Sequence, residues 1–219
     1  MNHMRTDTHL NYPRFFLGCG LAALLCSCSS TSIKKTSKSP DFQGAPRTRI
    51  AVLTVDDRGF LRQSFESRFA VCLQKRGAAP ITTFNLMPLA DIARDKPAAA
   101  ERLKKDGCDS VLICRLYDTS SSFREVRPGA ERYTDYISGV ENVGWYDYYS
   151  VAFMDMSPTY GNQKQQIHLE TVLFDLNTTK RLWSAMTLTV FVDGMDGMEE
   201  MDKVVAKVLS AMHKDKVGP

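Results

Sequence analysis

The sequence predicts an α/β (α+β) fold: a β-α-β-α-β core extended by a C-terminal antiparallel hairpin, with a final amphipathic helix packed on a mixed sheet. Three observations predict it. Short β-branched runs alternate with helical patterns between residues 49 and 117. Two alternating segments then flank a polar turn, and a helical apolar stripe ends the chain. Alternating strands and helices indicate a parallel core, whereas adjoining strands joined by a short turn indicate an antiparallel hairpin.

The first predicted strand is Arg49–Val55 (RIAVLTV), whose β-branched residues are typical of a buried strand. Asp56 and Asp57 are expected to cap the helix that follows, and Gly77 to end it. Arg62 and Glu66 are expected to lie largely off its apolar face. That face consists of residues at helical spacing: Leu61, Phe65, Phe69 and Cys72.

A second, shorter strand is predicted at Pro80–Phe84, followed by a turn or two of helix at Pro88–Arg94. The next helix has Pro97 in its first turn and closes at Gly107. Ser110–Tyr117 (SVLICRLY) is the third predicted strand and completes the core.

The second half predicts a hairpin of Gln166–Leu176 and Arg181–Val192 around the turn Asn177–Lys180. Asp196 opens the final helix, with Glu199 three residues later as in a capping box. Its apolar stripe is rich in methionine, and we expect that stripe to pack on the core. The stripe consists of Met198, Met201, Val205, Val208 and Met212.

A Tyr-rich insertion spans about 119–164, which is too long for a passive connection. Tyrosine and tryptophan offer contact area with a polar tip, as interfaces favour. The insertion therefore predicts a partner-binding or membrane-surface contact. The alternative is that its aromatic residues cover the open sheet. The best candidates for the contact are Trp145, Tyr146, Tyr148 and Tyr149.

The amino-terminal segment predicts export and lipidation. Phe15–Leu25 is an uncharged run of eleven residues, which suits a secretory signal and is short of the roughly 20 residues of a spanning helix. It ends in Leu25-Cys26-Ser27-Cys28, which resembles a bacterial lipobox. Residues 1–27 are thus a predicted signal peptide, and Cys28 is the predicted acceptor of acyl chains such as palmitate, anchoring the chain to a membrane. A short uncleaved hydrophobic anchor is the alternative.

Residues 28–47 are rich in Ser, Thr, Lys and Pro, and predict a flexible tether before a single domain at 48–215. Ser29 follows the lipidated position. By similarity to enterobacterial lipoproteins, a residue other than Asp there favours the periplasmic face of the outer membrane, with the outer leaflet of the inner membrane as the alternative.

The rest of the composition restricts the chemistry. A formal net charge of +3 is close to neutral and argues against nucleic-acid binding. Cys72, Cys108 and Cys114 could form one disulfide, with the pairing open, or be small buried hydrophobic residues. His168 is expected to face solvent. No C-x-x-C pair or phosphate-binding glycine motif occurs, so we expect no metal, no cofactor and no enzymatic activity.

The order of the motifs supplies a family resemblance. A lipobox is followed by RIAVLTV, by the Gly107–Ile113 stretch GCDSVLI, and by the hairpin Leu173–Ser184. This order resembles the envelope lipoproteins related to CsgG and LpoB, which share a TolB N-terminal-like α/β domain. The resemblance implies a non-enzymatic, lipid-anchored periplasmic adaptor that binds other envelope proteins. The alternatives are a subunit of an oligomeric CsgG-like secretion pore and, third, a periplasmic small-ligand receptor or enzyme.

Overall fold

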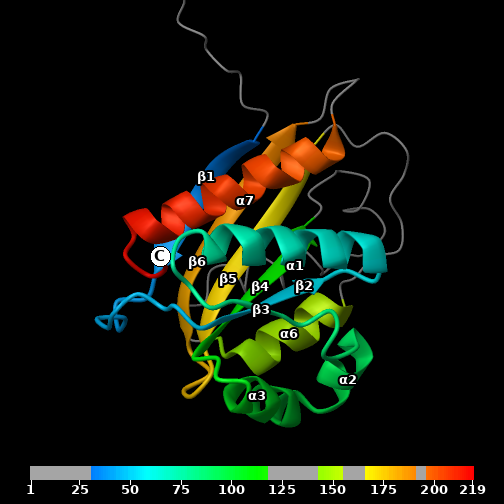
Figure 1. Ribbon diagram of the computed structural model, residues 1–219, viewed down its shortest axis with the longest axis vertical. Coiled ribbons are helices and arrows are strands. Elements are labelled where there is room, and N and C mark those ends of the chain that lie inside the picture. Colours follow the sequence, from blue (N-terminus) through cyan, green and yellow to red (C-terminus); the bar gives the residue numbers. More distant parts are fainter. Residues whose placement is uncertain (1–30, 118–142, 155–165, 191–195) are drawn as a thin grey trace, which may run out of the picture.

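The computed structural model describes residues 31–117, 143–154, 166–190 and 196–219. These residues form one six-stranded mixed sheet with five helices (Figure 1). The predicted mixed α/β fold is confirmed.

The sheet has the order β1-β6-β5-β4-β2-β3. Its strands are β1 (Thr31–Lys38), β2 (Ile50–Val55), β3 (Ile81–Thr82), β4 (Ser110–Tyr117), β5 (Gln166–Asp175) and β6 (Arg181–Val190). β2 runs parallel to both of its neighbours, β3 and β4, whereas the pairs β4–β5, β5–β6 and β6–β1 are antiparallel. The parallel half is the predicted β-α-β-α-β core, and the antiparallel half contains the predicted hairpin.

Helices cover the sheet from both sides (Figure 1). They are α1 (Gly59–Gln74), α2 (Leu89–Arg94), α3 (Lys96–Lys105), α6 (Trp145–Met154) and α7 (Gly197–Lys214). One core lies under α1 and α7 and includes Ile50 and Val52. The second lies under α2, α3 and α6 and includes Ala51 and Leu53. Because successive strand residues point to opposite faces, the β-branched run of β2 is buried on both sides.

Two glycines end helices as predicted. Gly77 (φ +85°) and Gly107 (φ +86°) both adopt the left-handed conformation that glycine takes without a steric penalty. A side chain at Gly107 would also overlap the guanidinium of Arg49. Among the helix starts, Asp196 caps α7 by accepting from the Met198 amide at 2.8 Å. The predicted aspartate cap of α1 is wrong: Arg58 occupies that position, and Asp56 instead accepts hydrogen bonds from Arg58.

The predicted face of α1 is partly wrong. Phe65 and Phe69 are buried as expected, but Arg62 and Glu66 are buried as well. They pair with each other inside the protein, so their charges do not require the solvent-facing side of the helix. The strand predicted at Pro80–Phe84 shortens to Ile81–Thr82.

The largest difference from the predicted organisation is at the start of the described chain. Residues 28–47 were expected to be a flexible tether, yet Thr31–Lys38 is strand β1, paired along its length with β6. After β1, Phe42 is buried, and Arg47 donates to Asp175 at 2.6 Å. Polar composition made this segment resemble a linker, but tertiary pairing with β6 supplies the backbone hydrogen bonds that order it.

Candidate functional site

The aromatic residues predicted to contact a partner lie on α6. Trp145, Tyr148 and Tyr149 are buried, whereas Tyr146 is half-buried. The expected exposed contact is therefore wrong for the three buried residues, and the alternative, that aromatic residues of the insertion cover the sheet, holds for them. The Tyr148 ring packs 5.3 Å from the Phe174 ring, centroid to centroid. Tyr149 donates to the Leu89 carbonyl at 2.8 Å, which joins α6 to α2.

A buried charged cluster fixes α6 to the sheet. The Arg115 Nε of β4 donates to Glu170 Oε2 of β5 at 2.7 Å. The Tyr148 hydroxyl donates to the same oxygen at 2.9 Å. Burial, and then the negative charge of Glu170, raise the pKa of Tyr148 well above its ordinary range, so this hydroxyl remains a donor at any physiological pH. The cluster therefore holds α6 against β4 and β5.

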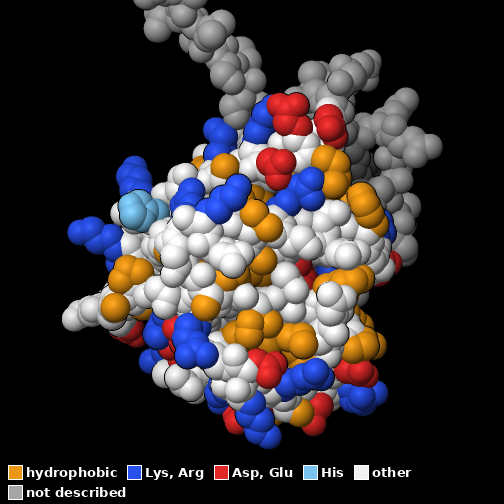
Figure 2. All heavy atoms as spheres, in the orientation of Figure 1, with side chains coloured by type: hydrophobic (Ala, Val, Ile, Leu, Met, Phe, Trp, Pro, Cys, Tyr) orange, Lys and Arg blue, Asp and Glu red, His pale blue; other side chains and the backbone are white. Residues whose placement is uncertain are grey.

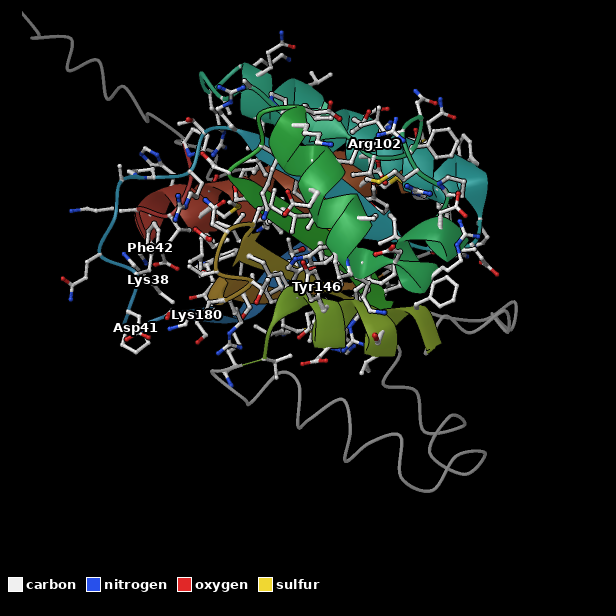
Figure 3. All side chains as sticks on the ribbon, turned by 90° about the horizontal axis from the view of Figure 1, so that it is seen from below. Lys38, Asp41, Phe42, Arg102, Tyr146 and Lys180 are labelled. Carbon is white, nitrogen blue, oxygen red and sulfur yellow. The ribbon has the colours of Figure 1, made fainter. Side chains whose placement is uncertain are left out.

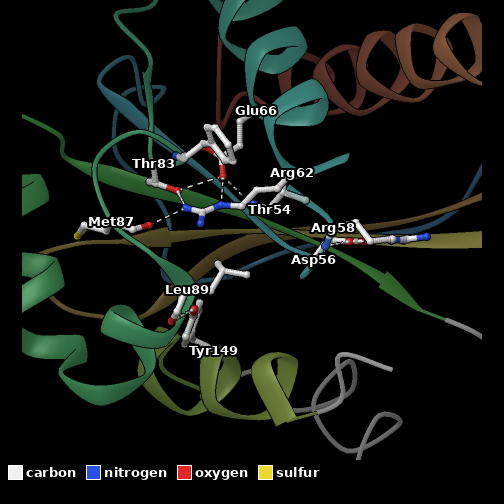
Figure 4. A network of polar contacts seen from close by, with 10 residues as sticks. Thr54, Asp56, Arg58, Arg62, Glu66, Thr83, Met87, Leu89 and Tyr149 are labelled. Carbon is white, nitrogen blue, oxygen red and sulfur yellow. Dashed lines mark hydrogen bonds and ion pairs between the residues drawn. The ribbon is translucent and has the colours of Figure 1, made fainter. Parts of the chain in front are cut away.

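A second buried network connects α1 to β2 and to the segment after β3 (Figure 4). Glu66 lies at its centre and accepts from Arg62 Nε at 2.9 Å, the Thr83 hydroxyl at 3.1 Å and the Thr54 amide at 3.1 Å. Arg62 also donates to the Met87 carbonyl at 2.9 Å. Every one of these contacts stays within the domain, so the network holds its elements together.

The three cysteines of the described chain are free thiols. Cys114 is buried in the core under α1 and α7, while Cys108 is buried in the opposite core. Burial raises the pKa of Cys108 to about 11 and that of Cys114 to about 12. Both behave as small hydrophobic residues, and Cys72 lies half-buried on α1.

His168 is partly buried on β5, which differs from the solvent-facing position expected for it. Partial burial and then the positive charge of Lys34 lower the pKa of this imidazole below its ordinary value. Within the described ranges, no three His, Cys, Asp or Glu side chains lie close enough together to hold a metal ion.

The feature that links the structure to the predicted anchor is the first residue of β1. Thr31 is 1 % exposed, and its hydroxyl oxygen lies 2.9 Å from that of Thr189 on β6. The same hydroxyl donates to Glu200, in the first turn of α7, at 3.4 Å. Cys28 itself lies outside the described residues, three positions before Thr31.

The register shows which ends of the strands share this part of the sheet. Thr31 pairs with Thr189, Gln166 with Val190, and Tyr117 with His168. The start of β1, the start of β5 and the ends of β4 and β6 therefore lie together. We call this the anchor end of the sheet. In Figure 2 acidic and basic side chains lie together at the top of the molecule, where β1 and α7 begin in Figure 1.

The opposite end of the sheet carries the β5–β6 turn. Lys180 lies 3.9 Å from Asp41 there, and both side chains are exposed. Phe42 lies beside them beneath the ammonium of Lys38, which is 5.3 Å from the centre of its ring (Figure 3). We call this the distal end of the sheet.

β1 is also the outermost strand on its side of the described sheet, with β6 as its neighbour. Lys34, Lys35, Thr36 and Lys38 of this strand are exposed. An edge strand presents backbone donors and acceptors that another chain can pair with, and lysines on it limit indiscriminate pairing. The sequence carries little signal for this strand, since its β-branched residues are Thr31, Ile33 and Thr36 among lysines and serines.

Comparison with known proteins gives only distant similarity. No protein-family model matches the chain, and no curated protein matches it either. Among solved structures, the PelC dodecamer from Paraburkholderia phytofirmans is 14% identical, with a TM-score of 0.46, and the match covers 82% of this chain and 95% of that one. Lipoprotein GNA1162 from Neisseria meningitidis is also 14% identical, with a TM-score of 0.39 and coverage of 76% and 99%.

TM-scores below 0.5 are too low to transfer the properties of these proteins to this chain. The described residues form a mixed α/β domain and include no helix long and apolar enough to span a bilayer.

Proposed function

We propose that this chain is a lipid-anchored envelope protein, acylated at Cys28, that acts as a non-enzymatic adaptor for another envelope protein. The observation that carries the proposal is the lipobox Leu25–Cys28 at the end of a leader too short to span a membrane. By similarity to enterobacterial lipoproteins, Ser29 after the acylated position supports an anchor on the periplasmic face of the outer membrane over one in the outer leaflet of the inner membrane.

The proposed partner surface is the outer edge of β1. Burial of Trp145, Tyr148 and Tyr149 removes the residues first considered for this role. The edge remains available in the described chain, because β1 has eight residues and β6 occupies one side of it. An extended segment of a partner can add to such an edge through backbone hydrogen bonds. The other outermost strand, β3, has two residues and offers few such groups.

The three lysines exposed along β1 determine which kind of partner strand the edge favours. Lys34, Lys35 and Lys38 favour a partner strand that carries acidic side chains beside its backbone groups. A neutral or basic strand would gain less from the same backbone pairing, so the lysines supply selectivity.

In-cell photocrosslinking tests this assignment. A benzoyl-phenylalanine at Thr36, exposed on β1, is expected to give a discrete crosslinked band that contains a second envelope protein. The matched control is the same group at Gln63, exposed on α1. A band from Gln63 and none from Thr36 would contradict the β1 assignment. A ladder of crosslinked copies of this chain would instead favour the oligomeric pore subunit.

A further inference from the structure

We infer that the lipid anchor holds this domain directly against the membrane in one orientation, with the anchor end of the sheet facing the lipid headgroups and the distal end directed away. The inference rests on the proposed acylation of Cys28 and adds to it a defined membrane-facing surface. That surface lies around the start of β1 and includes the exposed residues Asp196 and Glu199 at the start of α7.

The short connection between Cys28 and Thr31 limits how far the domain can lie from its lipid anchor. Cys28 precedes Thr31 by three residues. Three residues of fully extended chain span at most about 11 Å. A twenty-residue flexible tether, by contrast, has a mean end-to-end distance of about 25 Å and would let the domain turn freely. The acyl chains therefore enter the bilayer close to the sheet itself.

The attachment point is rigid as well as close. Thr31 is paired to Thr189 in the sheet and is buried, and its hydroxyl contacts both Thr189 and Glu200. These contacts fix the first residue of β1 to two other elements, β6 and α7. A force on the chain at Thr31 is therefore transmitted to β6 and α7 as well as to β1.

The length of the strands determines how far the distal end of the sheet lies from the anchor end. β6 has ten residues, Arg181–Val190, and a strand rises about 3.3 Å per residue, so its two ends lie about 30 Å apart. Val190 belongs to the anchor end, and the β5–β6 turn with Asn177 belongs to the distal end. The exposed residues Asp196 and Glu199, at the start of α7, lie at the anchor end.

Site-specific quenching tests the orientation in the acylated full-length protein, reconstituted in vesicles of phosphatidylethanolamine and phosphatidylglycerol. A fluorophore is attached at Glu199→Cys, at the anchor end, or at Asn177→Cys, at the distal end. Both residues are exposed. Cys72→Ser provides the background, because the buried thiols Cys108 and Cys114, with pKa values raised to about 11 and about 12, do not react near neutral pH.

A quencher carried on the lipid headgroup is expected to quench the Glu199→Cys label several-fold more than the Asn177→Cys label. A matched variant with about ten Gly and Ser residues inserted between Ser30 and Thr31 gains a mean reach of about 17 Å and is expected to lose this difference. Equal quenching at both positions with the native spacing would overturn the proposed orientation. A difference that persists with the insertion would overturn the claim that the short connection sets it.

Mass spectrometry of the same samples separates failure of this inference from failure of the proposed function. A chain acylated at Cys28 with equal quenching at both ends refutes the orientation alone. A chain without acylation at Cys28 refutes the anchor, and the orientation with it.

Discussion

The hydroxyl oxygens of Thr31 and Thr189 lie 2.9 Å apart and join the first residue of β1 to its neighbouring strand. This contact lies between residues separated by 158 positions in the chain. The contact lies at the first residue of β1, three positions after Cys28 in the sequence. It therefore fixes the end of the domain that follows the proposed anchor.

Replacing Thr31 with valine tests how firmly the start of β1 is held. Valine keeps the β-branched shape but loses the hydroxyl, so the Thr189 hydroxyl and the Glu200 carboxylate both lose their contact with it. We expect the free energy of unfolding to fall by about 1 to 2 kcal/mol, measured by urea denaturation. Thr36→Val, at an exposed site on the same strand, is the control and should change stability little. Equal effects of the two substitutions would contradict a special role for Thr31.

Substitution of Glu170, which accepts from both Arg115 and Tyr148, is expected to lower the free energy of unfolding by more than Thr31→Val does. Glu170→Ala removes a buried carboxylate that accepts from Arg115 Nε and from the Tyr148 hydroxyl, so we expect a loss of about 3 to 5 kcal/mol in the free energy of unfolding. Tyr148→Phe removes one hydrogen bond to Glu170 and should cost about 1 kcal/mol. Arg94→Ala breaks an exposed ion pair with Asp91 and serves as the control with little effect. A Glu170→Ala variant as stable as the Arg94→Ala variant would contradict the account of α6 as locked to the sheet.

His168 predicts a dependence of stability on pH. Its pKa is lowered in the folded protein, so between that pKa and the ordinary value of 6.5 the unfolded chain binds the proton more strongly. The contribution of neutral His168 to stability is therefore complete above pH 6.5 and is lost as the pH falls through the folded-state pKa. Denaturant midpoints measured across this range should decline less toward acid in His168→Gln than in the unmodified protein.

Lys34 provides a second check on the same residue. Its positive charge is part of the reason for the lowered pKa of His168. NMR titration of Lys34→Gln should place this pKa closer to 6.5, whereas Lys38→Gln should leave it unchanged. A His168 pKa that does not respond to Lys34→Gln would contradict the contribution of Lys34 to its lowering.

The cysteines should differ in reactivity. In the folded protein near neutral pH, a maleimide should modify Cys72 and leave Cys108 and Cys114 unmodified, because burial raises the pKa of both. Unfolding in guanidinium should expose all three thiols. Mass spectrometry counts the additions, and rapid modification of Cys114 in the folded state would contradict its position in the core.

Much of the fold could be predicted because its signals are local. The β-branched runs of β2 and β4, the glycines that end α1 and α3, and the turn at 177–180 each specify their own backbone conformation. Such signals do not depend on a distant partner.

β1 could not be predicted in this way. TSIKKTSK has one large apolar residue, and its order comes from pairing with β6, at the other end of the chain. The buried position of Glu66 likewise depends on Thr83, seventeen residues away. For α6, a usable signal was present: Trp145, Tyr148, Tyr149 and Ala152 follow the spacing of one helix face, and all four are buried.

The most direct test of the central claim is the mass of the mature N-terminal peptide, isolated from membranes of cells that express the full-length chain. We expect a peptide that begins at Cys28 and carries acyl chains, and we expect Cys28→Ser to lose both that species and its association with membranes. A chain that retains Phe15–Leu25, or an unmodified Cys28 on a membrane-bound protein, would contradict the proposed anchor.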